Sequence, residues 1–324
     1  MTGPQDTTGA TERPAGSTAA GGAARERRPD IERFLDYLQE TRGLSRNTTA
    51  AYGNDLRQYG EYLGEQGATG WEVPATTVSG FLEMLISREY AASSQARKLA
   101  AVKAMYRYLV EEGVVGSDPS KDIGGARVTK KRPNIISVSE ADRLLAAAAS
   151  SSTPEGYRNS AMLELLYGTG MRVSEIVALE TIDIDIDRLT VNCGRGTNRE
   201  RSIPFGPRVV QALGSYMRDA REKLLGVRTE TALFLNHRGR RLTRQGFWLI
   251  IKGHARTAEI ESTITPHTLR HSFAAHRLRN DGTIPEVQSV LGHASPVTTQ
   301  IYLELACEKG ATGALPGAQS RSSD

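Results

Sequence analysis

The sequence predicts a mainly α-helical protein of two domains, with a small antiparallel β-hairpin in the second domain. Three observations support this fold class. Apolar residues recur at helical spacing in four successive segments near the N-terminus, a stretch rich in Gly, Pro and basic residues then interrupts the pattern, and a pair of alternating apolar runs follows in mid-chain. A length of 324 residues is sufficient for a separate core in each of two domains.

The first predicted domain covers residues 29–113 and contains four helices. Each helix is indicated by apolar side chains on one face, and short polar segments separate the helices. The four stripes are Ile31, Phe34, Leu35 and Leu38; Tyr52, Leu56, Tyr59 and Leu63; Phe81, Leu82, Leu85 and Ile86; and Leu99, Val102, Tyr106 and Leu109. Four such helices with short connections predict a compact helical domain.

Residues 114–134 are predicted to form a basic interdomain linker. The stretch "GVVGSDPSKDIGGARVTKKRP" has no apolar periodicity and ends in a basic run, which is typical of linkers. At the two ends of the chain, residues 1–28 are rich in Gly, Ala and Thr, and residues 307–324 contain few large apolar residues. Both ends are therefore predicted to be disordered.

The second predicted domain covers residues 135–306 and has an α+β composition. Helices are predicted at 139–149 and 157–166, and helices dominate again from 207 to about 305. Between them, the runs "RLTVN" and "RSIPF" flank "CGRGTNRE", which predicts a β-hairpin with a Gly-rich turn.

The composition favours a cytoplasmic protein that does not interact with membranes. Hydrophobic residues make up 39% of the chain and charged residues 24%, and no apolar run approaches the length that spans a bilayer. The N-terminus lacks the basic and apolar regions of a secretory signal. Cys193 and Cys307 lack metal-site spacing and predict reduced thiols.

Basic residues are concentrated in two zones without acidic residues, although the net charge is only +4. Such zones favour binding to nucleic acid, whereas a solvated helix face is the alternative explanation. The first zone contains Arg97, Lys98, Lys103 and Arg107, with Arg46 near the start of an earlier helix; the second contains Arg238, Arg240, Arg241, Arg244, Lys252 and Arg256.

Three polar features of the second domain suit phosphate binding. Arg172 in "YGTGMRVSEIVAL" falls at a helix start, where free backbone N–H groups attract anions, and Glu175 lies one turn later and could orient it. In "TPHTLRHSF", a capping signal places His267 and Arg270 on one helix face. The third feature is the hairpin turn, which contains only one acidic residue beside three basic ones: Arg195, Arg199 and Arg201. Surface arginines and a structural histidine are the alternative interpretations.

The stretch "GHASPVTTQIY" contains His293 and, nine residues later, Tyr302. A helix is predicted to begin near Pro296, with Tyr302 at the edge of its apolar stripe. Alone, this pattern favours a tyrosine packed in a core. Combined with Arg172, His267, Arg270 and His293, the phenol gains partners for phosphoryl transfer without a metal or other cofactor: guanidiniums to neutralise phosphate oxygens, imidazoles to move protons, and a nucleophile.

The ordered motifs "GTGMRVSE", "HTLRHSFAAH" and "LGHASPVTTQIY" resemble the tyrosine recombinases, and most closely the Xer recombinases of bacterial chromosomes. The segments "GLSRNTTAAYGNDLRQYGEYL" and "RRLTRQGFWLIIK" extend the resemblance over roughly residues 30 to 303. It implies a helical, SAM-like core-binding domain and a catalytic domain that together clamp duplex DNA.

The resemblance also implies the reaction. Tyr302 would attack a DNA phosphodiester to give a 3′-phosphotyrosyl link, and Arg172, Arg270 and His293 would stabilise the transition state, with His267 accepting the proton from Tyr302. Four protomers, alike or of two kinds, would join two DNA sites through a Holliday junction. A second Xer recombinase and a septal DNA translocase are the partners it implies for chromosome or plasmid dimer resolution.

Two departures from the family pattern bear on activity. The usual hairpin lysine, which protonates the leaving oxygen, is replaced by Arg195 in a turn that is one residue longer. The tail after Leu305 has too few large apolar residues for the family's docking helix. Within the same chemistry, a phage or mobile-element integrase is the alternative to a Xer recombinase. The missing lysine motivates a second alternative, a catalytically weakened DNA-binding relative.

Overall fold

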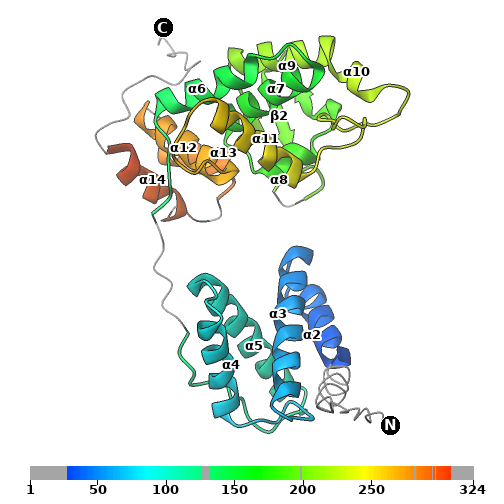
Figure 1. Ribbon diagram of the computed structural model, residues 1–324, viewed down its shortest axis with the longest axis vertical. Helices are drawn as coiled ribbons and strands as arrows, with labels where there is room; N and C mark the ends of the chain where they lie inside the picture. The colour runs from blue at the N-terminus through cyan, green and yellow to red at the C-terminus, as the bar shows by residue number, and fades with distance from the viewer. Residues whose placement is uncertain are drawn as a thin grey trace, which may run out of the picture. The chain divides into compact units, whose positions relative to one another are not determined.

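The computed structural model describes residues 28–125, 132–197, 199–280, 282–293, 295 and 297–307. The chain divides into two compact units, residues 1–131 and 132–324, each with its own core (Figure 1). The predicted leader and tail lie almost entirely outside the described residues. None of the helices in the described ranges is both long enough and apolar enough to cross a membrane.

The first unit consists of four helices, as predicted. They are α2 (Arg28–Glu40), α3 (Arg46–Glu65), α4 (Ala75–Ser87) and α5 (Ala92–Glu111). The predicted stripes meet in one core around Phe34, Leu56, Tyr59 and Phe81. Ile86 was predicted to be buried but is 55% exposed. The buried face of α4 instead includes Val78, one turn before Phe81.

Part of the predicted linker packs against the domain that precedes it. Val115 is buried in the core of the first unit, and Ile123 packs against the same core. At the other end, Ile136 is buried in the second unit, and its backbone N–H donates to Ser272 Oγ at 2.9 Å. Of the predicted linker, residues 126–131 lie outside the described ranges.

The second unit is helical around one small sheet. Its helices are α6 (Val138–Ala149), α7 (Pro154–Thr169), α8 (Val173–Ala178), the 3₁₀ helix η1 (Thr181–Asp183), α9 (Pro207–Asp219), α10 (Arg221–Leu225), α11 (Arg244–Thr257), α12 (Pro266–Arg279), α13 (Ile284–Leu291) and α14 (Val297–Cys307). Its strands are β1 (Ile184–Asp185), β2 (Thr190–Cys193) and β3 (Arg201–Pro204).

The predicted hairpin is confirmed and is extended by a third strand. β2 and β3 are antiparallel with Val191 opposite Ile203, and β1 pairs with β2 on its other side. With only two residues, β1 is too short to produce an alternating pattern that could be recognised in the sequence.

Helix packing in the second unit brings the predicted site segments together. α7 packs on α6, α9 and α12, and α12 also packs on α14 (Figure 1). A satellite core of α12, α13 and α14 contains Phe273, Ala274, Ala275, Val287, Leu291, Tyr302 and Leu305. The C-terminal end of α7, the face of α12, and α14 therefore meet at one place.

Candidate active site

The turn that ends α7 depends on Gly170. This residue is left-handed, with φ of 60°, and its N–H donates to Leu166 O at 2.9 Å. A Cβ at this position would collide with the ring of Phe273 on α12 and would lie 3.0 Å from a methyl group of Leu291. Glycine is needed both for the backbone conformation and for the close approach of α12. The turn places Arg172 beside α12 and α13.

Glu175 is held by two arginines at the start of α8. It accepts from the Arg172 backbone N–H at 2.7 Å and from Arg172 Nη1 at 3.0 Å. Arg201, from β3, donates to both Glu175 oxygens at 2.9 and 3.1 Å. Burial alone would raise the pKa of Glu175, but the hydrogen bonds from Arg201 and Arg172 and their charges hold this pKa below its ordinary value.

Arg270 on α12 joins the ends of two other helices. Its guanidinium donates to Gly170 O and to Leu291 O, each at 2.5 Å, and the residue is buried. Burial and the nearby charge of Arg172 lower the pKa of Arg270 to about 10, so it remains protonated near neutral pH. Arg172 Nη2 donates to Gly292 O at 3.3 Å. Two positive charges thus lie beside the turn that leads from α13 to His293.

His293 follows the left-handed Gly292 that caps α13. A hydrogen bond of 3.0 Å joins its Nδ1 to Thr299 Oγ1 on α14, and its ring centre lies 6.3 Å from that of Tyr302. Burial, together with the charges of Arg270 and Arg172, lowers the pKa of His293 to about 4. The imidazole is therefore neutral near pH 7.

Tyr302 belongs both to a core and to the polar site. Tyr302 is 3% exposed, and its ring packs in the satellite core. A hydrogen bond of 2.7 Å joins its hydroxyl to Nδ1 of His271. Burial raises the pKa of the Tyr302 phenol, and the charge of Arg270 opposes this effect. Both sequence interpretations, a packed ring and a partner of polar groups, therefore describe this one residue.

The histidine at the phenol is not the predicted one. His267 was expected to accept the proton from Tyr302, but His271, one turn further along α12, makes the contact. The His267 ring centre lies 6.3 Å from that of His271. Because His267 and His271 are at i and i+4 of one helix, both project from the same face. The second histidine of "HTLRHSF" was a signal that could have identified this residue.

Arg195 is turned toward acids of its own sheet. Its guanidinium pairs with Asp183 and lies 3.8 Å from Glu180, both at the η1 segment. Among the described residues, these two carboxylates are the ionic partners of Arg195, and its position beside the leaving oxygen remains a prediction. Asp183 is buried, so the pairing compensates its charge.

Three of the basic residues that were expected to bind DNA instead form hydrogen bonds or ion pairs within the protein. Lys98 is 7% exposed and donates to Asp55 at 2.9 Å and to Gln58 at 2.6 Å. Arg201 is held by Glu175, as described above, and Arg241 donates to the last carbonyls of α8. Their hydrogen bonds therefore stabilise the fold of the protein. Arg97 pairs with Asp55, but 45% of its side chain remains exposed. Four of the expected DNA-binding residues are exposed and have no ionic partner within the described ranges: Arg46, Arg107, Arg199 and Arg244.

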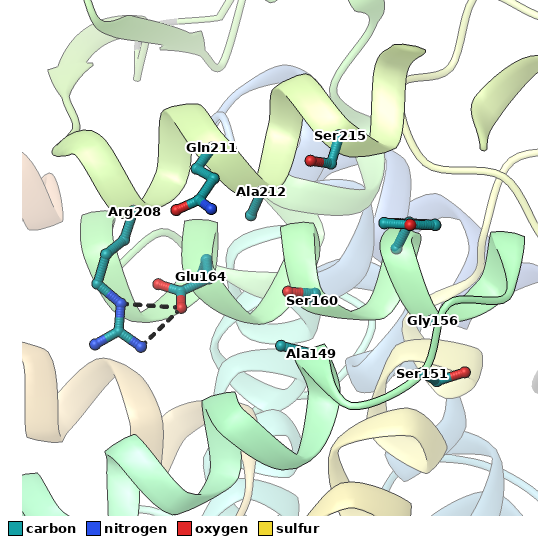
Figure 2. Close-up of a pocket in the computed structure, with 10 residues that line it drawn as sticks. Ala149, Ser151, Gly156, Ser160, Glu164, Arg208, Gln211, Ala212 and Ser215 are labelled. Carbon is teal, nitrogen blue, oxygen red and sulfur yellow. Dashed lines mark hydrogen bonds and ion pairs between the residues drawn. The ribbon is translucent and has the colours of Figure 1, made fainter. Parts of the chain in front are cut away.

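A separate cavity of about 300 Å³ lies between α7 and α9, beside the end of α6. Figure 2 shows the Arg208–Glu164 pair at one end of it and the small side chains of Ser160, Ala212 and Ser215 along it. Its lining contains none of the predicted site residues. Across the described ranges, His, Cys, Asp and Glu side chains form no group of three that could hold a metal ion.

Comparison with known proteins identifies the class to which this fold and site belong. Residues 134–309 match the phage integrase family, and residues 31–113 match the phage integrase N-terminal SAM-like domain. The chain belongs to the phage integrase family.

Individual relatives are named as Xer recombinases. The chain is 43% identical to tyrosine recombinase XerC of Herpetosiphon aurantiacus, covering 86% of this chain and 91% of the relative. It is 41% identical to tyrosine recombinase XerD of Oceanobacillus iheyensis, covering 84% and 92%. Its fold is similar to that of the XerH site-specific recombinase in a post-cleavage complex with a palindromic difH substrate. The TM-score is 0.68 at 19% identity, and the match covers 88% of this chain and 94% of the other.

Proposed function

We propose that this protein is a site-specific DNA recombinase whose nucleophile is Tyr302. The observation that carries the proposal is that the phenol lies beside His271 and His293, with the guanidinium of Arg270 near enough for its charge to oppose the rise in the phenol pKa that burial causes. In the reaction, the phenol oxygen attacks a DNA phosphodiester and the 5′-oxygen leaves. The 3′-phosphotyrosyl bond retains the energy of the broken bond, so a second strand can reverse the step without ATP.

Arg172 and Arg270 would neutralise the charge that develops on the non-bridging phosphate oxygens. Both are held in place by backbone carbonyls, and Arg172 also by Glu175, so their positions are fixed before DNA binds. His293 and His267 would donate hydrogen bonds to the same phosphate. Fixed donors that need no reorganisation are what stabilises a transition state most effectively.

Recombination of two duplexes requires four cleavages, one for each strand, so four protomers would act on two sites. The relatives named XerC and XerD support a recombinase of the Xer type. For such a recombinase we propose a role in the cytoplasm, the resolution of chromosome or plasmid dimers. A heterotetramer with a second Xer recombinase, under the control of a septal DNA translocase, is the form of this proposal that the resemblance suggests. A mobile-element integrase would carry out the same chemistry on a different pair of sites.

The test is a duplex that contains the protein's own site with a nick just downstream of the scissile phosphate, which traps the covalent product. Formation of a protein–DNA adduct on a denaturing gel is the expected result. Specific binding without an adduct would instead establish the weakened DNA-binding relative, an alternative that the pairing of Arg195 with Asp183 and Glu180 favours.

Arg195 is expected to limit the rate of cleavage. Arginine has a pKa above about 12 and is a poor proton donor, whereas lysine, near 10.4, can be tuned downward. General-acid help is worth about 10²–10⁴ in rate. Arg195→Lys, or a 5′-sulfur leaving group that needs no proton, should therefore accelerate single-turnover cleavage. If neither change increases the rate, departure of the 5′-oxygen is not the slow step, or its proton comes from another group.

DNA affinity is expected to depend on the exposed basic residues of the first unit. Arg46→Ala and Arg107→Ala should each reduce the slope of log K against log salt by about one unit, because each removes one phosphate contact. Lys98→Met is the matched control: it removes a positive charge from the same helix as Arg107, but this charge already neutralises Asp55. Its slope should stay at the wild-type value while chemical denaturation shows lower stability. A reduced slope for Lys98→Met would place DNA against that face.

A further inference from the structure

We propose that His271 accepts the proton of Tyr302 when the DNA strand is cleaved. The inference deepens the proposed function and rests on it. The geometry that carries it is the hydrogen bond of 2.7 Å between Tyr302 Oη and His271 Nδ1, which joins α14 to α12. A general base must lie within about 2.6–3.2 Å of the oxygen whose proton it takes, and His271 meets this condition.

The other histidines near Tyr302 are placed for different tasks. The Nδ1 of His293 is engaged by Thr299 at 3.0 Å, and the ring of His293 stacks 6.3 Å from the phenol ring. The ring centre of His267 is 6.3 Å from that of His271, on the same face of α12. Within the described residues, His271 is the imidazole that hydrogen-bonds to the phenol oxygen.

The surroundings keep the His271 ring neutral and therefore able to accept a proton. Burial lowers its pKa to about 4, and the charges of His267 and Arg270 on α12 contribute in the same direction. From α14 it faces Tyr302, with ring centres 5.5 Å apart, and the ring centre of His293 lies 6.3 Å from that of Tyr302. A DNA phosphate bound between the arginines adds negative charge, which raises the pKa of a nearby imidazole and makes it a stronger base.

The proposed step is balanced in protons and electrons. The O–H bond of Tyr302 breaks and its proton moves to Nδ1 of His271, in the tautomer that carries its own proton on Nε2. The phenol oxygen forms a bond to phosphorus while the bond from phosphorus to O5′ breaks. O5′ leaves with the electron pair and takes a proton from water, and the imidazolium returns a proton to the solvent.

The test compares His271→Asn with wild type in single-turnover cleavage of the nicked duplex between pH 6 and 9. Asparagine places an oxygen near the position of Nδ1, so it still accepts the hydrogen bond but does not accept the proton. Wild-type cleavage should vary little with pH, whereas the variant should be about 10²–10⁴-fold slower at pH 7. Its rate should rise about tenfold per pH unit, because hydroxide must then generate the phenolate below the phenol pKa.

Two controls make the result specific. His267→Asn, on the same face of α12, should slow cleavage without producing this rise with pH, and His237→Asn, at an exposed position, should leave the rate unchanged. If His271→Asn binds duplex DNA poorly, His271→Ala with added imidazole replaces it, and cleavage should increase with imidazole concentration.

The outcomes separate this inference from the function on which it rests. An adduct formed by His271→Asn at the wild-type rate and with a flat pH profile overturns the role of His271, as does an absence of rescue of His271→Ala by imidazole. A rise with pH in His267→Asn alone assigns the role to His267. Failure of the wild-type protein to form any adduct on its own site removes the proposed function instead.

Discussion

Tyr302→Phe should abolish covalent attachment to DNA and leave duplex binding within a few-fold of wild type. The substitution removes only the phenol oxygen, whereas affinity comes mainly from many phosphate contacts spread over the protein. It also removes the hydrogen bond to His271, which should lower the free energy of unfolding by about 1 kcal/mol. The nicked-duplex assay measures attachment, and fluorescence anisotropy with an intact duplex measures binding.

Tyr167→Phe is the matched control, because Tyr167 is a second buried tyrosine that contacts a histidine of α12. Its hydroxyl is 2.8 Å from His276 Nδ1, and burial raises its pKa well above the ordinary value. This variant should retain attachment. Undiminished adduct from Tyr302→Phe, or a loss of adduct in Tyr167→Phe without a loss of folding, would assign the nucleophile to Tyr167 or another residue.

Glu175→Ala should destabilise the second unit by about 3 kcal/mol and remove cleavage activity together with it. The substitution leaves Arg201, only 13% exposed, without its carboxylate and frees Arg172 from its capping contact. Loss of one partner of a buried pair costs far more than loss of an exposed one, because the remaining charge stays buried. Chemical denaturation measures the difference, and Glu222→Ala, at an exposed position of α10, provides a surface control that should have little effect.

The pH dependence of this difference follows from the direction of the pKa shift. The pKa of Glu175 is lower in the folded protein than its ordinary value of 4.5. Its contribution to stability is therefore fully present above about pH 4.5 and is lost as the pH falls through the folded pKa. The stability gap between wild type and Glu175→Ala should be constant near neutrality and narrow below this range. A gap that widens on acidification would contradict the assignment.

The helices and the hairpin could be predicted because their signals are local. Each apolar stripe of the first unit needs only the 3.6-residue period, and Thr265 with Pro266 marks the start of α12 independently of everything else in the fold. The position of Arg172 at the start of α8 was visible from the glycines before it. For such features, neighbouring residues contain the whole physical cause.

The contacts of the site could not be predicted in the same way, since they depend on which elements pack together. His267 and His271 are equivalent by helix periodicity, and the packing of α14 against α12 decides which of them contacts Tyr302. Similarly, Lys98 looks like a surface residue of a basic zone until α3 brings Asp55 against it. The contacts of His271 and of Lys98 both depend on tertiary packing that leaves no pattern in the local sequence.

The burial of Tyr302 has a consequence for fidelity. Exposing the ring to DNA costs about 1.5–3 kcal/mol, even where the hydroxyl keeps its hydrogen bond to His271. At 1.4 kcal/mol for each factor of ten, an accessible phenol is then about 10- to 140-fold less populated than the buried one. Only a DNA site that binds more tightly to the protein with an exposed Tyr302 phenol raises the population of this accessible state. Two sequences that are bound equally well can therefore be cut at very different rates, and discrimination between them takes place after association.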